Sequence, residues 1–255
     1  VQRRQSDTQG DPAKAVCRSL SKADGGLAGA SLKLARHALG AASPGRSVPL
    51  ALGVAESDIK YIETQDAKDY AANMGQFTNK KYDVVITVGF LMTDATVAAA
   101  TATPTTRFIG VDQGYDAAAV TEKNITGLIF PEDQAGYGAG YLAGLMTKTN
   151  KLGQVLGLEI PPVQKFAKGF EAGAKAANPK GSVATVYHPA ADNAFNNPVW
   201  GAGEAKKQLA QGADIIFGAG GNTGNGALQE VAKADGAGTA KFSIGVDTDQ
   251  WFTVP

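Results

Sequence analysis

The tetrapeptide Ile-Gly-Val-Asp occurs twice in this chain, at residues 109–112 and again at residues 244–247. Each copy follows an apolar run that begins with aspartate, at residues 83–90 and 214–221. Near-continuous apolar runs rich in β-branched residues are typical of parallel strands that are buried on both faces. A helix-length segment separates each run from its tetrapeptide, so the sequence predicts two βαβ units. We therefore expect two α/β lobes, each with a doubly wound parallel sheet.

The residues that follow the predicted strands are the first candidates for a binding site. In sheets of this kind, ligands bind beyond the carboxyl ends of the strands. Two halves that aim these ends at a shared cleft predict a binding protein that holds its ligand between the two lobes. The residues at the predicted strand ends are Gly89, Phe90, Asp112, Gly220, Gly221 and Asp247.

The domain organisation follows from the alternation of predicted strands and helices, which is clear from about residue 54 onward. Residues 1–53 have a weaker apolar pattern, and there a glycine-rich turn leads into a predicted helix over residues 31–42. We predict a first lobe over residues 1–115, to which residues 245–255 return, and a second lobe over residues 116–244.

The composition excludes several classes of function. Lys plus Arg and Asp plus Glu number 24 each, so no overall charge attracts nucleic acid, and a small uncharged ligand fits better. No apolar run approaches the roughly 20 residues that span a bilayer. Cys17 is the single cysteine and His37 and His188 are the two histidines. The chain therefore has too few cysteines for a thiolate metal cluster and few histidines for a catalytic triad, and we expect no cofactor.

The glycine-rich segment at residues 218–226 joins a predicted strand to a helix start, as phosphate loops do. The dinucleotide-binding spacing requires glycine at position 223, which is threonine, and the P-loop pattern does not occur. Two interpretations remain open. The bare backbone can let a sugar or a base edge approach closely, or the glycines can form a turn that serves packing alone.

Two kinds of side chain near the strand ends can bind a ligand. The carboxylates of Asp112 and Asp247 can accept hydrogen bonds from vicinal hydroxyls such as those of ribose, or they can cap a helix or a hinge. Phe195 stands in a polar loop after a predicted strand. Its ring can stack on a base, or it can fill the core.

Three segments of the second half resemble the basic membrane protein family. They are residues 139–149, the pair Ile160-Pro161, and the pattern in which Phe166 and Phe170 each precede a glycine by three residues. Members of this family are substrate-binding lipoproteins of bacterial ABC importers, similar to the purine-nucleoside receptor, with the type I periplasmic-binding-protein fold. The resemblance runs from about residue 53 to residue 250.

The resemblance implies a nucleoside ligand whose base lies between aromatic rings and whose ribose is held by carboxylates. Phe195 matches the stacking phenylalanine of the second lobe, and Asp247 resembles the ribose-binding aspartate. Gly220 or Gly221 corresponds to a backbone contact, and Asp112 to an acidic residue at the end of a first-lobe strand.

The family's amino-terminal signature is only partly present. Asp24 matches its aspartate, whereas Leu32 replaces the second stacking ring and Lys33 replaces the asparagine that reads the base.

The resemblance further implies an extracytoplasmic, lipid-anchored monomer that delivers its ligand to an ABC transporter permease and binds no nucleic acid. A sugar receptor of the same fold is the main alternative. An enzyme, either a nucleotide-dependent oxidoreductase or a nucleoside hydrolase, is a weaker one. A transcriptional regulator requires a helix-turn-helix, for which residues 1–9 are too short.

Overall fold

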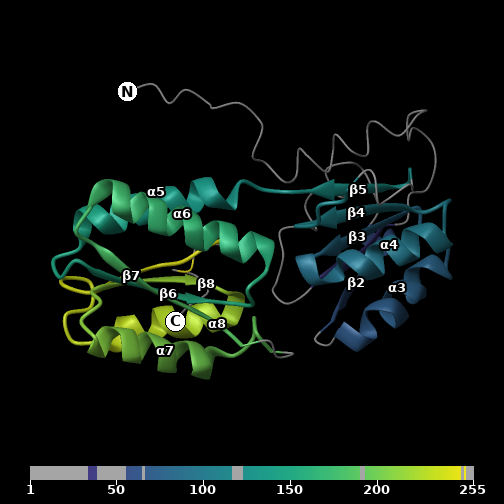
Figure 1. Ribbon diagram of the computed structural model, residues 1–255. Helices are drawn as coiled ribbons and strands as arrows, with labels where there is room; N and C mark the ends of the chain where they lie inside the picture. Colours follow the sequence, from purple (N-terminus) through teal and green to yellow (C-terminus); the bar gives the residue numbers. More distant parts are fainter. Residues whose placement is uncertain are drawn as a thin grey trace. The chain divides into compact units, whose positions relative to one another are not determined.

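A computed structural model describes residues 56–64, 67–116, 123–189, 193–247 and 250, together with the backbone of residues 34–38. The contacts divide the chain into two compact units, Val1–Phe130 and Pro131–Pro255 (Figure 1). The fold is α/β with parallel sheets, as the repeat predicts.

The first unit contains a parallel sheet with the strand order β2-β1-β3-β4-β5. Helices α3 and α4 cross one face of this sheet, where Val85 and Phe108 pack beneath them. On the other face Val84, Ile86 and Ile109 are also buried, which accounts for the near-continuous apolar runs. The elements are β1 (Leu34–Ala38), η2 (Glu56–Asp58), β2 (Ile59–Glu63), η3 (Ala67–Asp69), α3 (Tyr70–Thr78), β3 (Val84–Val88), η4 (Phe90–Met92), α4 (Thr93–Ala102), β4 (Arg107–Val111) and β5 (Ile125–Leu128).

Strand β1 corrects the predicted helix over residues 31–42. It lies inside the sheet, paired in parallel with both β2 and β3. Pairing on both sides supplies hydrogen-bond partners for the whole segment, so tertiary context overrides a local sequence that favours a helix.

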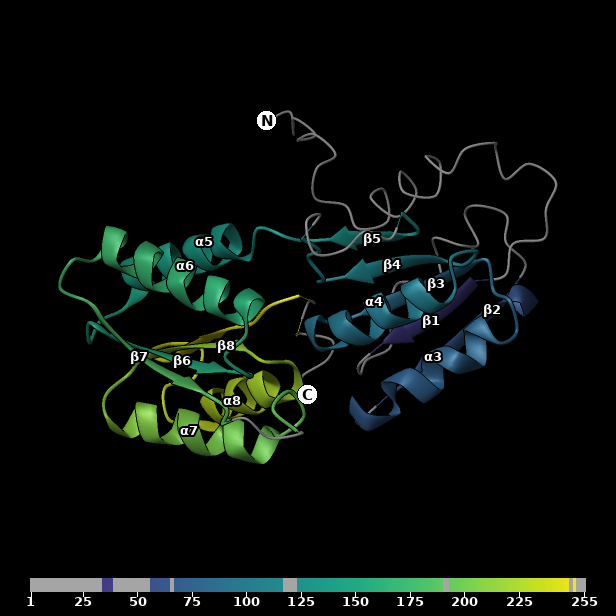
Figure 2. The ribbon, with the colours of Figure 1, turned by 45° about the vertical axis from the view of Figure 1, so that its right-hand side comes forward.

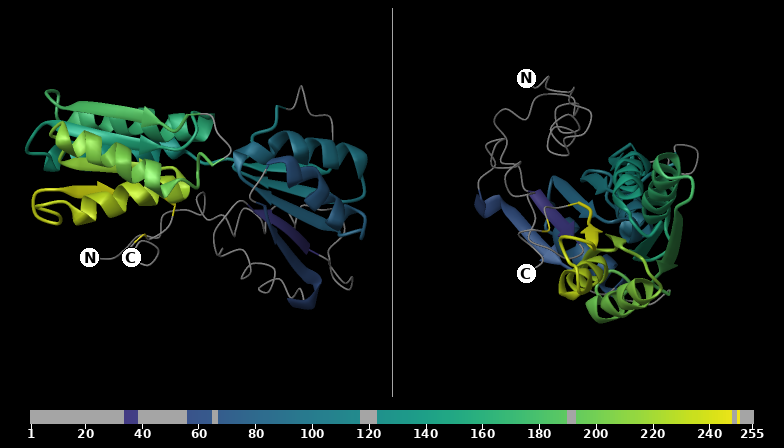
Figure 3. Two further views of the ribbon diagram at one scale, coloured as in Figure 1. Left: turned by 90° about the horizontal axis from the view of Figure 1, so that it is seen from below. Right: turned by 90° about the vertical axis from the view of Figure 1, so that its left-hand side faces the viewer.

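The second unit has a four-stranded parallel sheet with the order β7-β6-β8-β9. Helices α5 and α6 cover one face and α7 and α8 cover the other (Figure 2). Seen from below, α7 and α8 lie side by side across the sheet (Figure 3). The elements are α5 (Glu132–Met146), β6 (Lys151–Leu156), α6 (Pro161–Ala177), β7 (Ser182–Tyr187), α7 (Pro198–Ala210), β8 (Ile215–Ala219), α8 (Gly221–Lys233) and β9 (Phe242–Ile244).

The core of the second unit has two parts, one on each face of the sheet, because successive side chains of a strand point to opposite faces. Leu152, Leu156, Ile215 and Phe217 face α5 and α6, and the Phe217 ring stacks on Phe170 of α6 with centroids 4.7 Å apart. Val155 and Ile216 face α7 and α8. The sheet is therefore buried on both faces, which is the doubly wound arrangement expected from the sequence.

Helices α5 and α6 are in contact through their main chains. A Cβ atom built on Gly140 of α5 would overlap the carbonyl oxygen of Phe170, and one built on Gly173 of α6 would overlap that of Tyr137. Gly136, Gly144 and Gly169 are equally close to the opposite backbone. The small residues thus permit close helix packing, which offsets the low helix propensity of glycine.

The repeated tetrapeptide occupies the same structural position in both units. Strand β3 pairs with β4 so that Ile86 is opposite Ile109, and β8 pairs with β9 so that Phe217 is opposite Ile244. In both copies the final aspartate has a left-handed backbone, with φ of 60° at Asp112 and 68° at Asp247. The two predicted βαβ units are therefore present, with matching strand register.

The division between the units differs from the predicted boundary at residues 115/116. Strand β5 accounts for the difference, because it hydrogen-bonds to β4 and extends the first unit to Phe130. The contacts also group residue 245 with the second unit. The return of residues 245–255 to the first lobe stays a prediction.

The helix contact can be tested with two alanine substitutions in α5. Gly140→Ala is expected to destabilise the chain by about 1–3 kcal/mol, because the new methyl group meets backbone that cannot move aside. Gly138→Ala is the matched control, since no atom lies within 4 Å of its Cβ position, and it should stabilise the chain by up to about 1 kcal/mol. Urea denaturation followed by circular dichroism measures both changes. Equal effects of the two substitutions would contradict the close packing.

Candidate functional site

Strands β6 and β8 are each followed directly by a glycine, and there their main chains are in direct contact. Leu156 is paired with Ala219, so Gly157 and Gly220 follow on adjacent strands, and the Gly157 N–H donates to the Ala219 carbonyl at 2.9 Å. A Cβ atom on Gly220 would lie 2.5 Å from the Gly157 nitrogen. This edge of the sheet therefore has room for main chain only.

Phe195 lies against this bare backbone. A Cβ atom on Gly157 would overlap the edge of the Phe195 ring, and one on Gly221 would lie 2.8 Å from the Phe195 carbonyl oxygen. Three of the predicted site residues, Phe195, Gly220 and Gly221, are thus brought together within the second unit. Phe195 is half-buried and also packs against the core of the second unit. Both interpretations of this ring, core filling and presentation to a ligand, agree with its position.

The loop that carries Phe195 is fastened by a histidine and an asparagine. The Asn197 side chain accepts a hydrogen bond from the Trp200 N–H at 3.1 Å and so caps α7. Its amide group lies 3.1 Å from His188 Nε2, and the other ring nitrogen lies 2.8 Å from the Pro189 carbonyl oxygen. The His188 ring is also 4.5 Å from the Trp200 ring, edge to face. His188 and Trp200 therefore serve packing and loop geometry.

Asp247 follows Val246 just beyond β9, in the left-handed conformation that aspartate tolerates better than most residues. The residue is exposed at the surface. Nevertheless, protein atoms around its carboxyl group remove part of its hydration and raise its pKa, and repulsion from Glu132 adds to the shift. A carboxylate that has lost part of its hydration in this way is a good acceptor of hydrogen bonds from ligand hydroxyl groups.

Glu132 opens α5 and is nearly buried, at 6% exposure. Its Oε2 atom lies 3.1 Å from Lys165 Nζ on α6, so an ion pair compensates this carboxylate. Glu132 lies in the first turn of α5, where an acidic side chain complements the helix dipole. Its influence on Asp247 could not be predicted, because the two residues are distant in sequence.

The first unit places Phe90 and Asp112 at neighbouring strand ends. The Gly89 N–H donates to the Val111 carbonyl at 3.0 Å, which joins the end of β3 to the end of β4. Phe90 and Asp112 are both partly exposed there. The buried amide of Gln113 donates to Thr87 Oγ1 and to the Gly89 carbonyl, so it fixes the backbone beside both residues.

Asp24, the remaining predicted site residue, lies outside the described residues. Gly157 and Gln113 were missed by sequence reasoning, although both stand next to predicted strand ends. Gly157 directly follows strand β6, as Gly89 and Gly220 follow β3 and β8, and this shared pattern could have identified it.

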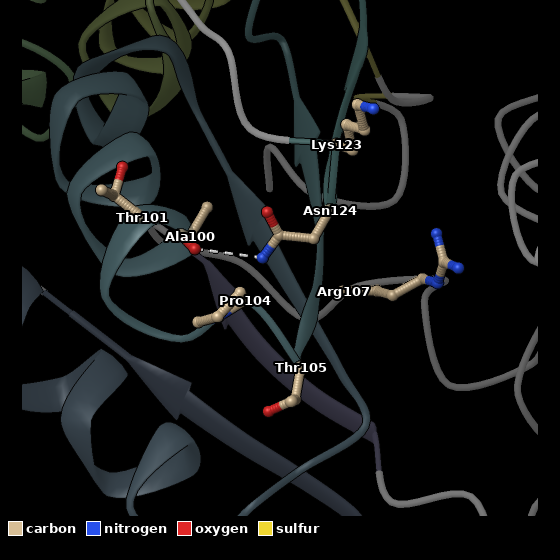
Figure 4. A pocket seen from close by; sticks show the side chains of 7 residues that line it. All are labelled: Ala100, Thr101, Pro104, Thr105, Arg107, Lys123 and Asn124. Carbon is tan, nitrogen blue, oxygen red and sulfur yellow. Dashed lines mark hydrogen bonds between the residues drawn. The ribbon is translucent and has the colours of Figure 1, made fainter.

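The first unit also has a depression at the opposite ends of its strands (Figure 4). The Asn124 side chain donates there to the carbonyl oxygens of Ala100, Thr103 and Thr106, and so satisfies the end of α4. Arg107 and Lys123 do not point toward one another (Figure 4). This arrangement serves helix capping, and it lies away from the predicted site residues.

Two features are absent from the described part of the chain. No cluster of three or more His, Cys, Asp or Glu side chains is placed to hold a metal ion there. Within the same residues, no helix combines the length and the apolar character needed to cross a membrane.

Comparison with curated proteins finds several relatives. The CD4+ T-cell-stimulating antigen of Listeria monocytogenes is 33% identical over 193 residues, which is 75% of this chain and 52% of that protein. The ABC transporter nucleoside-binding protein BmpA of Lactococcus lactis is 30% identical over 193 residues, which is 74% of this chain and 53% of that protein. This chain therefore spans about half the length of these relatives.

Solved structures with the same fold include two ABC transporter solute-binding proteins. The protein from Aeropyrum pernix superposes with a TM-score of 0.74 at 22% identity, over 87% of this chain and 64% of that one. The protein from Conexibacter woesei gives a TM-score of 0.57 at 24% identity, over 78% of this chain and 68% of that one. At these identities the likeness confirms the type I periplasmic-binding-protein fold alone.

The family model described as ABC transporter substrate-binding protein PnrA-like matches residues 51–255. This region contains both βαβ units and every predicted site residue except Asp24. The resemblance drawn from the sequence motifs is confirmed, and the chain belongs to the PnrA-like family of ABC transporter substrate-binding proteins.

Proposed function

We propose that this chain is the ligand-binding part of an extracytoplasmic receptor that captures a nucleoside and delivers it to an ABC transporter permease. Family membership and the name of the Lactococcus lactis relative support this proposal. The nucleoside would be bound and released with no chemical change. We also keep the prediction of a lipid-anchored monomer.

One observation carries the nucleoside assignment. The half-buried Phe195 ring lies on the Gly157 backbone beside Gly220 and Gly221, at the carboxyl edge of a parallel sheet. Stacking of a base on an aromatic ring contributes about 1–3 kcal/mol, and the exposed Gly221 at the start of α8 can bind the edge of the base through its backbone. The site therefore offers a flat apolar surface and polar backbone groups within one loop cluster.

Asp247 would supply the complementary polar contact. The residue reaches the surface, but desolvation of its carboxyl group and the nearby Glu132 raise its pKa, so ligand hydroxyl groups that donate hydrogen bonds would relieve both effects. Ribose presents two vicinal hydroxyls that suit such an acceptor. Phe90 and Asp112 would contribute from the first unit, together with Asp24.

A sugar receptor of the same fold is the second candidate. The packing of Phe195 against the core favours it, because a ring that fills the core would leave only the sugar-binding groups. The two candidates differ in whether a base contributes to affinity.

The assignment can be tested by calorimetric titration of the chain with purine nucleosides, pyrimidine nucleosides and free ribose. Nucleosides should bind more tightly than ribose. Phe195→Ala should weaken nucleoside binding about 10- to 100-fold, the equivalent of one lost stacking contact, and leave ribose binding unchanged. Equal affinity for ribose and nucleosides would favour the sugar receptor, and turnover of inosine or guanosine would show an enzyme.

Asp247→Asn separates binding from stability. The pKa of Asp247 is raised above 3.8 in the folded state. At pH values above this raised pKa the ionised carboxylate lowers the free energy of unfolding. This loss of stability disappears as the pH falls through the raised pKa, because the carboxyl group is then protonated. The variant should therefore melt no lower than the wild type at pH 7, with a difference that shrinks toward pH 4, while nucleoside affinity falls. Melting curves at several pH values and a titration measure the two effects. A lower melting temperature at pH 7 would contradict this account of Asp247.

A further inference from the structure

We propose that Thr223 is the positioning residue of the nucleoside site, and that its hydroxyl group sets the affinity for the base without affecting the affinity for the sugar. The inference rests on the proposed function. Thr223 belongs to the first turn of α8, two residues after Gly221, and it is fully buried.

The Thr223 hydroxyl group joins the two ends of the Phe195 loop. Its Oγ1 atom accepts a hydrogen bond from the Asn197 N–H at 2.9 Å and donates one to the Ala194 carbonyl at 2.9 Å. The loop between these two residues carries the ring. One buried oxygen thus holds the backbone on both sides of Phe195.

Thr223 itself is held in place by main-chain packing between α7 and α8. A Cβ atom on Gly201 of α7 would overlap the Thr223 carbonyl oxygen, and one on Gly226 of α8 would overlap that of Pro198. The two helix starts are therefore packed against each other through their main chains. The hydroxyl group connects the loop to this packed structure.

The other hydrogen bonds of the loop are weaker candidates for positioning Phe195. Asn222 donates to Asn196 Oδ1 at 2.8 Å, but this pair is exposed, where water competes. His188 contacts the Asn197 side chain and does not reach Phe195 through any described hydrogen bond. Thr223 alone among these residues is bonded to both ends of the loop.

Loss of the hydroxyl group would leave the part-buried Asn197 N–H and the buried Ala194 carbonyl without this partner. Both groups would then recover hydrogen bonds by moving toward water, and the loop would carry Phe195 away from the Gly157 backbone. Asp247 belongs to the segment after β9, so its contact with ribose does not depend on this loop. The base and the sugar should therefore respond differently to one substitution.

Thr223→Val tests the inference, because valine has nearly the same shape but no hydroxyl group. Calorimetric titration should show that nucleoside affinity falls by about tenfold, whereas ribose affinity changes by less than twofold. Thr223→Ser keeps the hydroxyl group and should bind the nucleoside within twofold of the wild type.

Thr147 provides a matched control within the same unit. Its hydroxyl group also accepts from a backbone N–H, that of Asn150, and donates to an oxygen, Asp214 Oδ1 at 2.7 Å. It lies at the amino-terminal ends of β6 and β8, away from the Phe195 loop. Thr147→Val should lower stability but leave both affinities unchanged.

The outcomes separate this inference from the proposed function. Wild-type nucleoside affinity in Thr223→Val, or an equal loss in Thr147→Val, would overturn the positioning role while the function stands. A wild-type chain that binds no nucleoside would overturn the function and the inference together. If Thr223→Val does not fold, Thr223→Cys takes its place, since a thiol is a weaker donor of similar size, and wild-type affinity in that variant would also overturn the role.

Discussion

The main-chain contact between Gly157 and Gly220 is the constraint on which the second unit's site depends. Parallel pairing of β6 with β8 brings these residues together, and a side chain on either of them would collide with the neighbouring strand or with Phe195. The absence of side chains lets the Phe195 ring lie against this buried edge, next to the exposed Gly221, whose backbone can meet a ligand. The loop and the two helix starts are then assembled around that edge.

Close backbone approach recurs elsewhere in the second unit. Helices α5 and α6 are in contact through glycines, and so are the starts of α7 and α8. Both helix layers are therefore rigid supports for the strand ends. The segment after β9 can in consequence carry Asp247, whose left-handed backbone, with φ of 68°, would cost stability in an unsupported segment.

Much of this fold could be predicted from the sequence, because buried parallel strands and amphipathic helices have distinct periodicities. The two βαβ units around the repeated tetrapeptide are examples. Strand β1 could not be predicted, since its pairing with β2 and β3 outweighs a local preference for helix. For the site, position at strand ends and resemblance indicated Phe195, Gly220 and Asp247. Thr223 and Glu132 act through contacts between distant segments, which no local pattern records.

We propose that the flat surface of Phe195 and the carboxylate of Asp247 bind the two halves of a nucleoside. A crystal structure of the chain with a bound purine nucleoside should then show the base against Phe195 beside Gly220 and Gly221, with the ribose hydroxyls on Asp247. A ligand bound elsewhere, or one whose base has no contact with Phe195, would contradict it.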